Sequence, residues 1–157
     1  MAEYPRNKQV QAILEAAHAE SSHLRHEYLG TEHLLLGLLG CQGAVALDIL
    51  IALGVPVDQV RENVLRTVIP GAAMGGAETD LPFTTRAQAV IALTLTAARE
   101  LGHDYVRSED LLLGLAREEH GLAALVLALH GASLPRLRAE VERFATGGRR
   151  EPRFGDG

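Results

Sequence analysis

The sequence predicts an all-α protein built from two similar four-helix repeats. A 14-residue stretch that begins at His26 recurs 77 positions later, beginning at His103, and eight of the fourteen aligned residues are identical without a gap. Elsewhere, apolar residues follow the three- and four-residue spacing of amphipathic helices, and no segment shows convincing strand alternation. An internal repeat decides the fold more firmly than any single motif.

Four helices are predicted in the first repeat. Asn7 is a good N-cap for the first of them. Thr31 is expected to cap the second helix, which is apolar nearly all round and should therefore be the central buried one. Gly54 stands where a glycine ends the third helix, and Pro56 opens the fourth. The predicted helices cover residues 7–24, 31–39, about 44–53 and about 56–68.

The second repeat follows the same plan. Its first helix has the apolar stripe of the first repeat at the same offset of 77 residues. Thr84 and Ser108 are the expected caps of its first two helices. The helices are predicted at residues 84–101, from 108 onward, at about 121–130 and at about 133–145.

The same pattern predicts the division of the chain. One repeat covers residues 6–69 and the other residues 83–146. Residues 70–82, rich in glycine and bounded by two prolines, are expected to be a linker. The glycine- and arginine-containing tail, residues 147–157, is expected to be disordered.

Composition excludes several classes of protein. A net charge of −5 argues against a nucleic-acid binder, which needs a basic stripe. No apolar run reaches the roughly 18 residues of a membrane span. Cys41 is the only cysteine, so no intrachain disulfide can form, and the N-terminus lacks a signal-peptide hydrophobic region. We therefore expect a soluble, cytoplasmic protein.

The sequence offers little support for an enzyme site. The histidines of the first repeat invite a metal hypothesis, but their spacings are five, three and seven residues, none of them is the H-E-x-x-H arrangement, and no cysteine pair supports a structural zinc site. No nucleophile elbow and no phosphate loop of the G-x-x-x-x-G-K-[ST] type occur. A metal-dependent hydrolase on a helical bundle is thus the weakest alternative, and we expect no metal, no cofactor and no catalytic residue. The histidines concerned are His18, His23, His26 and His33.

Two motifs carry a resemblance to a known family. Residues 28–38, Tyr-Leu-Gly-Thr-Glu-His-Leu-Leu-Leu-Gly-Leu, resemble the signature of the Clp N-terminal repeat. Residues 83–87, Phe-Thr-Thr-Arg-Ala, followed by Leu101-Gly102-His103, resemble the opening of that repeat. The match covers about residues 6–145 and is most similar to the N-domains of ClpC-type AAA+ unfoldases. The resemblance implies a pseudo-twofold, eight-helix globular domain.

The resemblance also implies a function. Such N-domains are docking modules rather than enzymes, and they receive adaptor and substrate proteins for the Clp protease. ClpC-type members bind phosphoarginine, a degradation mark, and are targets of cyclic-peptide antibiotics. The chain is therefore expected to be a free-standing Clp N-domain protein that acts as an adaptor or sequestering module. The alternative is the N-domain portion of a full ClpC-type unfoldase.

Four ligand-binding residues follow from the resemblance. The family's threonine at the start of the first helix and the glutamate of its Gly-Thr-Glu-His segment map in the second repeat to Thr84 and Glu109. In the first repeat they map to Asn7, which replaces the threonine, and to Glu32. The second repeat departs from the family at two further positions. Arg107 stands where the first repeat has Gly30, and Asp110 stands where it has His33, as in a diverged paralogue.

Overall fold

The computed structural model describes residues 6–72 and 81–146, and this part of the chain holds eight helices and no sheet. The expected all-α fold is confirmed, and every predicted helix is present within a few residues of its expected position. The middle of the predicted linker and the predicted disordered tail lie outside the described residues. The helices are α1 Lys8–His23, α2 Thr31–Leu39, α3 Val45–Ala52, α4 Val57–Thr67, α5 Thr85–Glu100, α6 Ser108–Arg117, α7 Leu122–Leu129 and α8 Leu134–Ala145.

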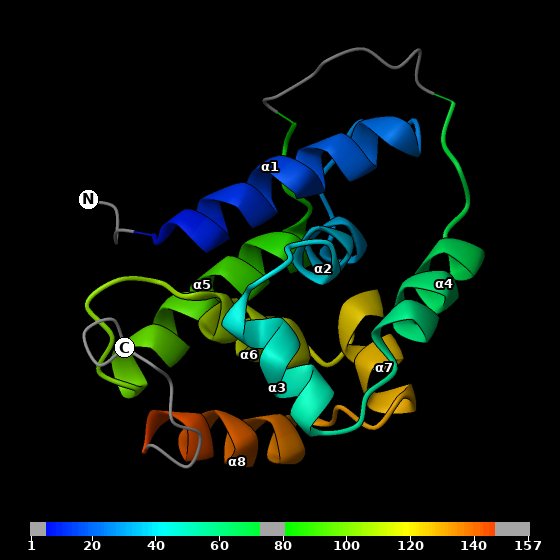
Figure 1. Cartoon of the computed structure of the whole chain (residues 1–157). Coiled ribbons are helices and arrows are strands. Elements are labelled where there is room, and N and C mark those ends of the chain that lie inside the picture. Colours follow the sequence, from blue (N-terminus) through cyan, green and yellow to red (C-terminus); the bar gives the residue numbers. More distant parts are fainter. Residues whose placement is uncertain (1–5, 73–80, 147–157) are drawn as a thin grey trace.

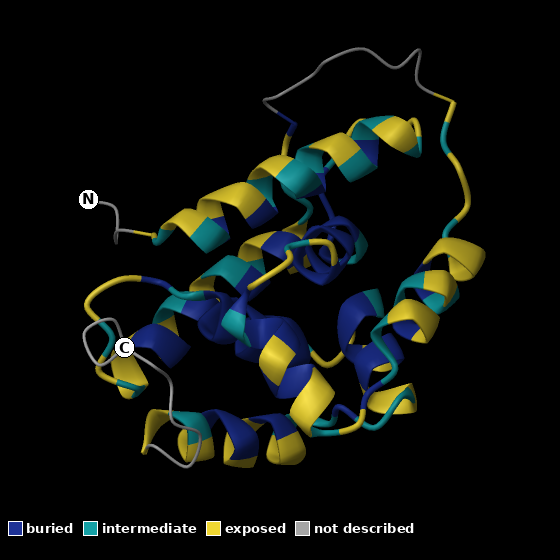
Figure 2. Cartoon of the chain, viewed as in Figure 1, coloured by how far each residue is buried: buried dark blue, intermediate teal, exposed yellow. Residues whose placement is uncertain are grey.

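The two copies of the repeated stretch, α2 and α6, form the centre of the molecule (Figure 1). Helix α1 packs along α2 and α5 packs along α6, and these are the two most extensive helix pairs. Figure 2 shows both central helices almost wholly buried. Only Glu32 in α2 and Arg117 in α6 are not buried, which agrees with the expectation of an apolar central helix. Both repeats contribute to one continuous hydrophobic core.

A glycine at equivalent positions permits each of these two helix pairs to approach closely. A Cβ atom at Gly37 would lie 2.6 Å from the carbonyl oxygen of Ile13 in α1. A Cβ atom at Gly114 would lie 2.9 Å from the carbonyl oxygen of Val90 in α5 and would also meet the Thr94 hydroxyl. Since real Cβ atoms do not come this close to backbone, each pair requires glycine at its crossing.

Two of the four expected helix caps are confirmed. Asn7 Oδ1 accepts a hydrogen bond from the backbone N–H of Val10 at 2.9 Å, and Thr84 Oγ1 accepts one from that of Ala87 at 3.1 Å. Each side chain thereby satisfies one of the N–H groups that have no partner within the helix.

The expected capping roles of Thr31 and Ser108 are wrong. Both residues are already the first helical residue, and the N-cap positions are Gly30 and Arg107. Their buried hydroxyls instead accept hydrogen bonds from the opposite repeat. Thr31 Oγ1 accepts from Ala123 N at 3.3 Å, at the start of α7, and Ser108 Oγ accepts from Ala46 N at 3.0 Å, at the start of α3. The hydroxyls therefore join the two repeats.

Short extended segments pair the helix starts across the repeats. The segment before α1 runs beside the one before α6, with Asn7 N donating to Val106 O at 3.0 Å. The segment before α5 runs beside the one before α2, with Thr84 N donating to Leu29 O at 2.9 Å. As a result, the N-terminus of each repeat's first helix lies next to the N-terminus of the other repeat's second helix.

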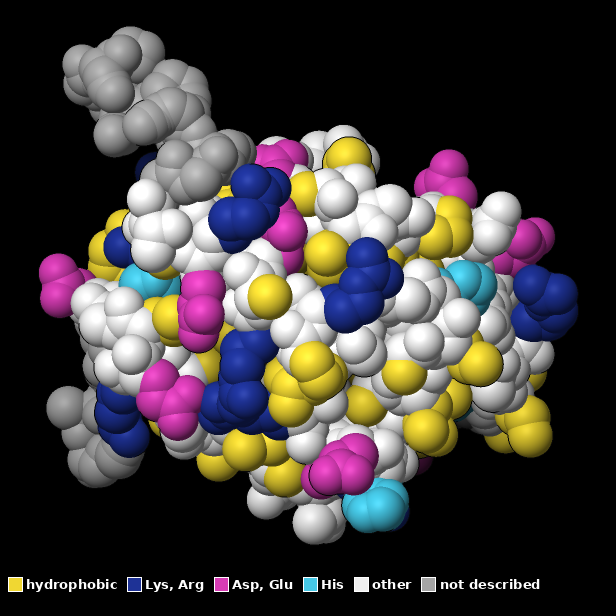
Figure 3. Space-filling view, turned by 90° about the horizontal axis from the view of Figure 1, so that it is seen from below, with side chains coloured by type: hydrophobic (Ala, Val, Ile, Leu, Met, Phe, Trp, Pro, Cys, Tyr) yellow, Lys and Arg dark blue, Asp and Glu magenta, His cyan; other side chains and the backbone are white. Residues whose placement is uncertain are grey.

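The surface shows no strongly basic stripe on the face of Figure 3, where Lys and Arg are interspersed with Asp, Glu and apolar side chains. This agrees with the net charge of −5. Within residues 6–72 and 81–146, no helix has both the length and the apolar character that crossing a membrane requires.

Candidate functional site

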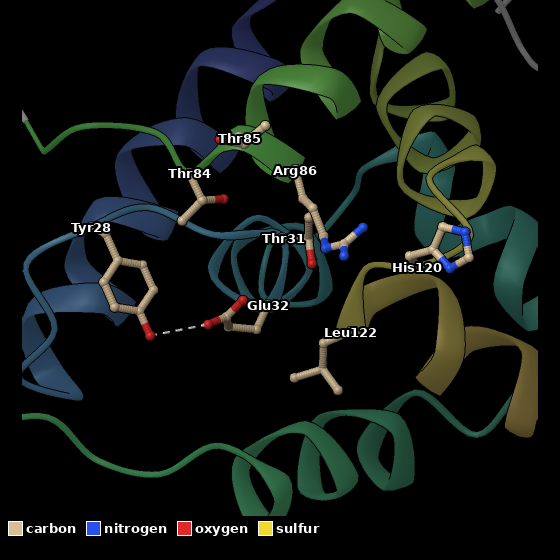
Figure 4. A pocket seen from close by; sticks show the side chains of 8 residues that line it. All are labelled: Tyr28, Thr31, Glu32, Thr84, Thr85, Arg86, His120 and Leu122. Atoms are coloured by element: carbon tan, nitrogen blue, oxygen red, sulfur yellow. Dashed lines mark hydrogen bonds between the residues drawn. The ribbon is translucent and has the colours of Figure 1, made fainter.

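A pocket of about 390 Å³ lies where the N-termini of α2 and α5 meet the start of α7. Figure 4 shows Tyr28 and His120 at opposite ends of this pocket, with the Glu32 carboxylate and the Arg86 guanidinium between them. The lining residues are Tyr28, Thr31, Glu32, Thr84, Thr85, Arg86, His120 and Leu122.

This pocket brings together two of the four predicted site residues, Glu32 and Thr84, from different repeats. The prediction from the sequence pairs Thr84 with Glu109 and Asn7 with Glu32, because the resemblance applies to each repeat separately. The segments that pair across the repeats explain the difference, since Leu29 and Thr84 are joined by a backbone hydrogen bond. The other two predicted residues, Asn7 and Glu109, do not line this pocket.

Tyr28 holds the Glu32 carboxylate at the pocket. The Tyr28 hydroxyl donates to Glu32 Oε2 at 3.4 Å. Burial of the ring and the neighbouring Glu32 charge raise the pKa of the Tyr28 phenol, so it remains a donor at neutral pH. Glu32 itself is only partly buried and lines the pocket, so its carboxylate can meet a cationic group there.

The N-terminus of α5 supplies groups of the opposite character. Because Thr84 Oγ1 already accepts the N–H of Ala87, the N–H groups of Thr85 and Arg86 are the ones without a helical acceptor. A helix of this length also places a partial positive charge at its start. Arg86 adds a full charge and is held only loosely, by a 3.4 Å contact with Glu118 at a side chain that is 54% exposed. The pocket therefore has a carboxylate beside an anion-binding helix start.

A chain of hydrogen bonds lies behind this pocket. Gly30 N donates to His33 Nδ1 at 2.9 Å, His33 Nε2 lies 2.8 Å from His26 Nδ1, and His26 Nε2 lies 2.8 Å from Ile69 O. The directions follow from the ends, because a backbone N–H can only donate and a carbonyl can only accept. His33 is therefore the neutral Nε2–H tautomer, and burial together with the neighbouring His26 lowers the pKa of His33 to about 4.

In the part of the chain that the structure describes, these two histidines and Glu32 form the group whose side chains could hold a metal ion. One ligand atom from each of His26, Glu32 and His33 falls within 4.8 Å of the others. All four ring nitrogens of the two histidines are engaged in the hydrogen bonds just described, so an ion would have to displace at least one of them. His26 packs its loop instead, through the 2.8 Å hydrogen bond between its Nε2 and the backbone carbonyl of Ile69.

Asp110 takes the place of His33 in the second repeat and accepts the equivalent hydrogen bond. Its Oδ2 accepts the N–H of Arg107 at 2.9 Å, as His33 Nδ1 accepts that of Gly30. The Asp110 carboxylate also lies 2.8 Å from His103 Nδ1. The change from histidine to aspartate thus preserves a buried cap and does not touch the pocket.

Sequence reasoning did not assign six of the lining residues to the site, Thr31 among them because it was expected only as a helix cap. The six are Tyr28, Thr31, Thr85, Arg86, His120 and Leu122. Tyr28, Thr85 and Arg86 lie inside the quoted motifs, so their motif membership was a usable signal. His120 and Leu122 lie beyond any motif and reach the pocket only because α7 packs beside α2.

Comparison with known proteins gives consistent matches. The model of the Clp repeat (R) N-terminal domain family matches residues 6–130 and 82–153. The chain is 39% identical over 132 residues to the chloroplastic chaperone protein ClpC1 of Arabidopsis thaliana and to the chloroplastic ClpA homolog of Brassica napus. The aligned segment is 84% of this chain but only 14% and 15% of those proteins.

Solved structures show the same fold. The N-terminal domain of ClpD from Arabidopsis thaliana has a TM-score of 0.73 at 23% identity, covering 94% of this chain and 98% of that one. The N-domain of ClpV from Vibrio cholerae has a TM-score of 0.74 at 21% identity, covering 90% and 83%. A complex of a ClpV N-domain with a VipB peptide has a TM-score of 0.73 at 20% identity, covering 90% and 87%.

Proposed function

Because this chain belongs to the Clp repeat (R) N-terminal domain family, we propose that it is a non-enzymatic docking module that binds peptide segments of partner proteins. The single observation that carries the proposal is the pocket in which Glu32 lies beside the N-terminus of α5. Support also comes from the related ClpV N-domain, which was solved in complex with a VipB peptide. The partners would be adaptor and substrate proteins of the Clp protease.

Phosphoarginine is the ligand whose chemistry fits this pocket best. Its guanidinium would pair with the Glu32 carboxylate in a charge-assisted contact. Its phosphoryl group would be bound by the N–H groups of Thr85 and Arg86, the hydroxyls of Thr84 and Thr85, and the Arg86 guanidinium. The pocket thus offers a carboxylate to the cationic half of this ligand and several hydrogen-bond donors to its anionic half.

A free-standing adaptor or sequestering protein is one setting for this module. As an adaptor, it would deliver marked substrates to the protease. As a sequestering module, it would keep substrates or cyclic-peptide antibiotics away from the protease. A cytoplasmic location remains a prediction, since the relatives named above are chloroplastic.

A second candidate is the N-domain of a longer, ATP-dependent ClpC-type unfoldase. This candidate is favoured because the aligned segment makes up only 15% of the Brassica napus protein and 14% of the Arabidopsis thaliana protein. Sequencing the gene beyond the codon for Gly157 distinguishes the two. A stop codon rejects the unfoldase, and a linker followed by a phosphate loop rejects the free-standing form.

Calorimetric titration with phosphoarginine tests the ligand, with arginine and inorganic phosphate titrated separately as controls. We expect binding of phosphoarginine and a loss of about 10- to 100-fold in affinity in Glu32→Gln, since a hydrogen bond to a charged group contributes about 1.5–3 kcal/mol. Glu62→Gln, on the exposed side of α4 and away from the pocket, is the matched control and should bind as the wild type does. Absence of heat at millimolar phosphoarginine, or equal affinity in Glu32→Gln, contradicts the proposal.

A further inference from the structure

The two repeats place equivalent residues at two equivalent positions in the molecule. The pocket at Glu32 lies where the segment before α2 pairs with the segment before α5. The equivalent position is where the segment before α6 pairs with the segment before α1, through Asn7 N and Val106 O. There the sequence places Glu109 for Glu32 and Asn7 for Thr84. A symmetric protein would have two similar pockets.

Gly30 allows the Glu32 carboxylate to lie at its pocket. The backbone of Gly30 has φ −105° and ψ −179°, a conformation open to any residue, so glycine is not needed for its flexibility. What glycine provides is room. A Cβ atom on residue 30 would lie 2.6 Å from Glu32 Oε1 and 3.1 Å from Glu32 Cδ. With any other residue here, the Glu32 carboxylate would have to shift from the position it has beside the Tyr28 hydroxyl.

The second repeat has a side chain at this position. Arg107 has φ −117° and ψ 166°, nearly the backbone conformation of Gly30, so its Cβ atom points in the equivalent direction. The glutamate beside it does not lie as Glu32 does. Glu109 is 8% exposed, and within residues 6–72 and 81–146 its Oε1 has no hydrogen-bond partner. Burial is the main reason that the pKa of Glu109 is raised.

The tyrosine of the second repeat has also changed partner. The Tyr28 hydroxyl donates a hydrogen bond to Glu32. At the equivalent Tyr105, the guanidinium carbon of Arg107 lies over the ring, 5.1 Å from its centroid. This cation–π contact has no counterpart in the first repeat, where Gly30 has no side chain to place over Tyr28. The Cβ atom and the guanidinium of one residue account for both differences between the repeats.

We infer that the residue at positions 30 and 107 sets the number of ligand pockets, and that Arg107 closes the second one by turning Glu109 inward. The chain therefore binds one peptide ligand bearing a guanidinium and a phosphoryl group, at Glu32, and not two. This inference rests on the proposed function for the identity of the ligand. The closure of the pocket at Glu109 is independent of that identity.

Carboxylate labelling tests the closure without any ligand. A water-soluble carbodiimide with an amine couples to accessible carboxylates, and mass spectrometry of the peptides gives the rate at each glutamate. In the wild type we expect Glu32 to be labelled and Glu109 to be protected. Arg107→Gly should accelerate labelling of Glu109 several-fold, and Gly30→Ala should change the labelling of Glu32 but not that of Glu109.

Arg107→Ala is the decisive control, because it removes the guanidinium and keeps the Cβ atom. Glu109 should stay largely protected in this variant. Equal labelling of Glu32 and Glu109 in the wild type overturns the inference, and so does a Glu109 rate in Arg107→Gly no higher than in the wild type. Circular dichroism of each variant confirms that the helices are retained.

Titration with phosphoarginine then measures the number of sites. We expect one site per chain in the wild type and in Arg107→Ala, two in Arg107→Gly, and weakened binding in Gly30→Ala. Two sites in the wild type overturn the inference while supporting the proposed function. If no variant binds phosphoarginine, the proposed ligand is wrong, and the labelling rates still decide whether Arg107 closes the second pocket.

Discussion

Acidification should destabilise this protein through His33, a fully buried histidine in the first turn of α2 that lies 2.8 Å from His26. The folded state lowers the pKa of His33 from the ordinary 6.5 to about 4. Between these values the unfolded chain binds a proton that the folded chain does not. The contribution of neutral His33 to the free energy of unfolding is therefore fully present above about pH 6.5 and is lost as the pH falls toward 4.

The size of the effect follows from the two pKa values. At pH 5 the unfolded histidine is almost fully protonated and the folded one is mostly neutral, which lowers the free energy of unfolding by about 2 kcal/mol. The limit below pH 4 is about 3 kcal/mol for a shift of this size. A proton on Nδ1 would also break the hydrogen bond from Gly30 N.

Urea denaturation at pH 7 and pH 5 measures this loss, and His33→Asn isolates it. Asparagine can accept the N–H of Gly30 as Asp110 does in the second repeat, but it does not titrate. The wild type should lose about 2 kcal/mol more than His33→Asn between these pH values. The comparison removes the contributions of Glu109 and Asp110, whose pKa values burial raises and whose effect has the opposite sign. Equal losses in the two proteins would refute the reasoning.

Two further substitutions test contacts that hold the helices together. Ser108→Ala should lower the free energy of unfolding by about 1–3 kcal/mol in a denaturation curve, because it leaves the buried N–H of Ala46 without its acceptor; an unchanged midpoint would show that this hydrogen bond contributes nothing. Gly114→Ala should cost about 1–3 kcal/mol by pressing α6 against the carbonyl of Val90. Gly40→Ala, where the nearest atom to a new Cβ is 3.6 Å away, is its control and should change the melting temperature little; similar shifts in both would contradict the packing argument.

The helices were predictable because their signals are local. The spacing of apolar residues in α1 and α5 and the capping side chains of Asn7 and Thr84 act within one or two turns, and the structure has them where the sequence placed them. The duplicated stretch could likewise be recognised as a buried centre, since α2 is apolar on nearly every side.

The hydroxyls of Thr31 and Ser108 show where local reasoning fails. A threonine or serine at a helix start is most simply explained as its own cap. Here each one accepts an N–H that is 92 or 62 residues away, from the opposite repeat. A hydrogen bond of that range depends on how the repeats pack, and a pattern along the chain does not contain that information.

The residue types of the candidate site were also evident from the chain, because Glu32, Thr84, Asn7 and Glu109 stand within recurring motifs. Their grouping was not, since it depends on which helix starts meet in space. Leu29 pairs with the segment before α5, and so Glu32 shares a pocket with Thr84 and not with Asn7. The consequence of Arg107 was equally hidden. The sequence shows arginine in the second repeat where the first has glycine. The structure adds that a Cβ atom at Gly30 would lie only 2.6 Å from Glu32 Oε1.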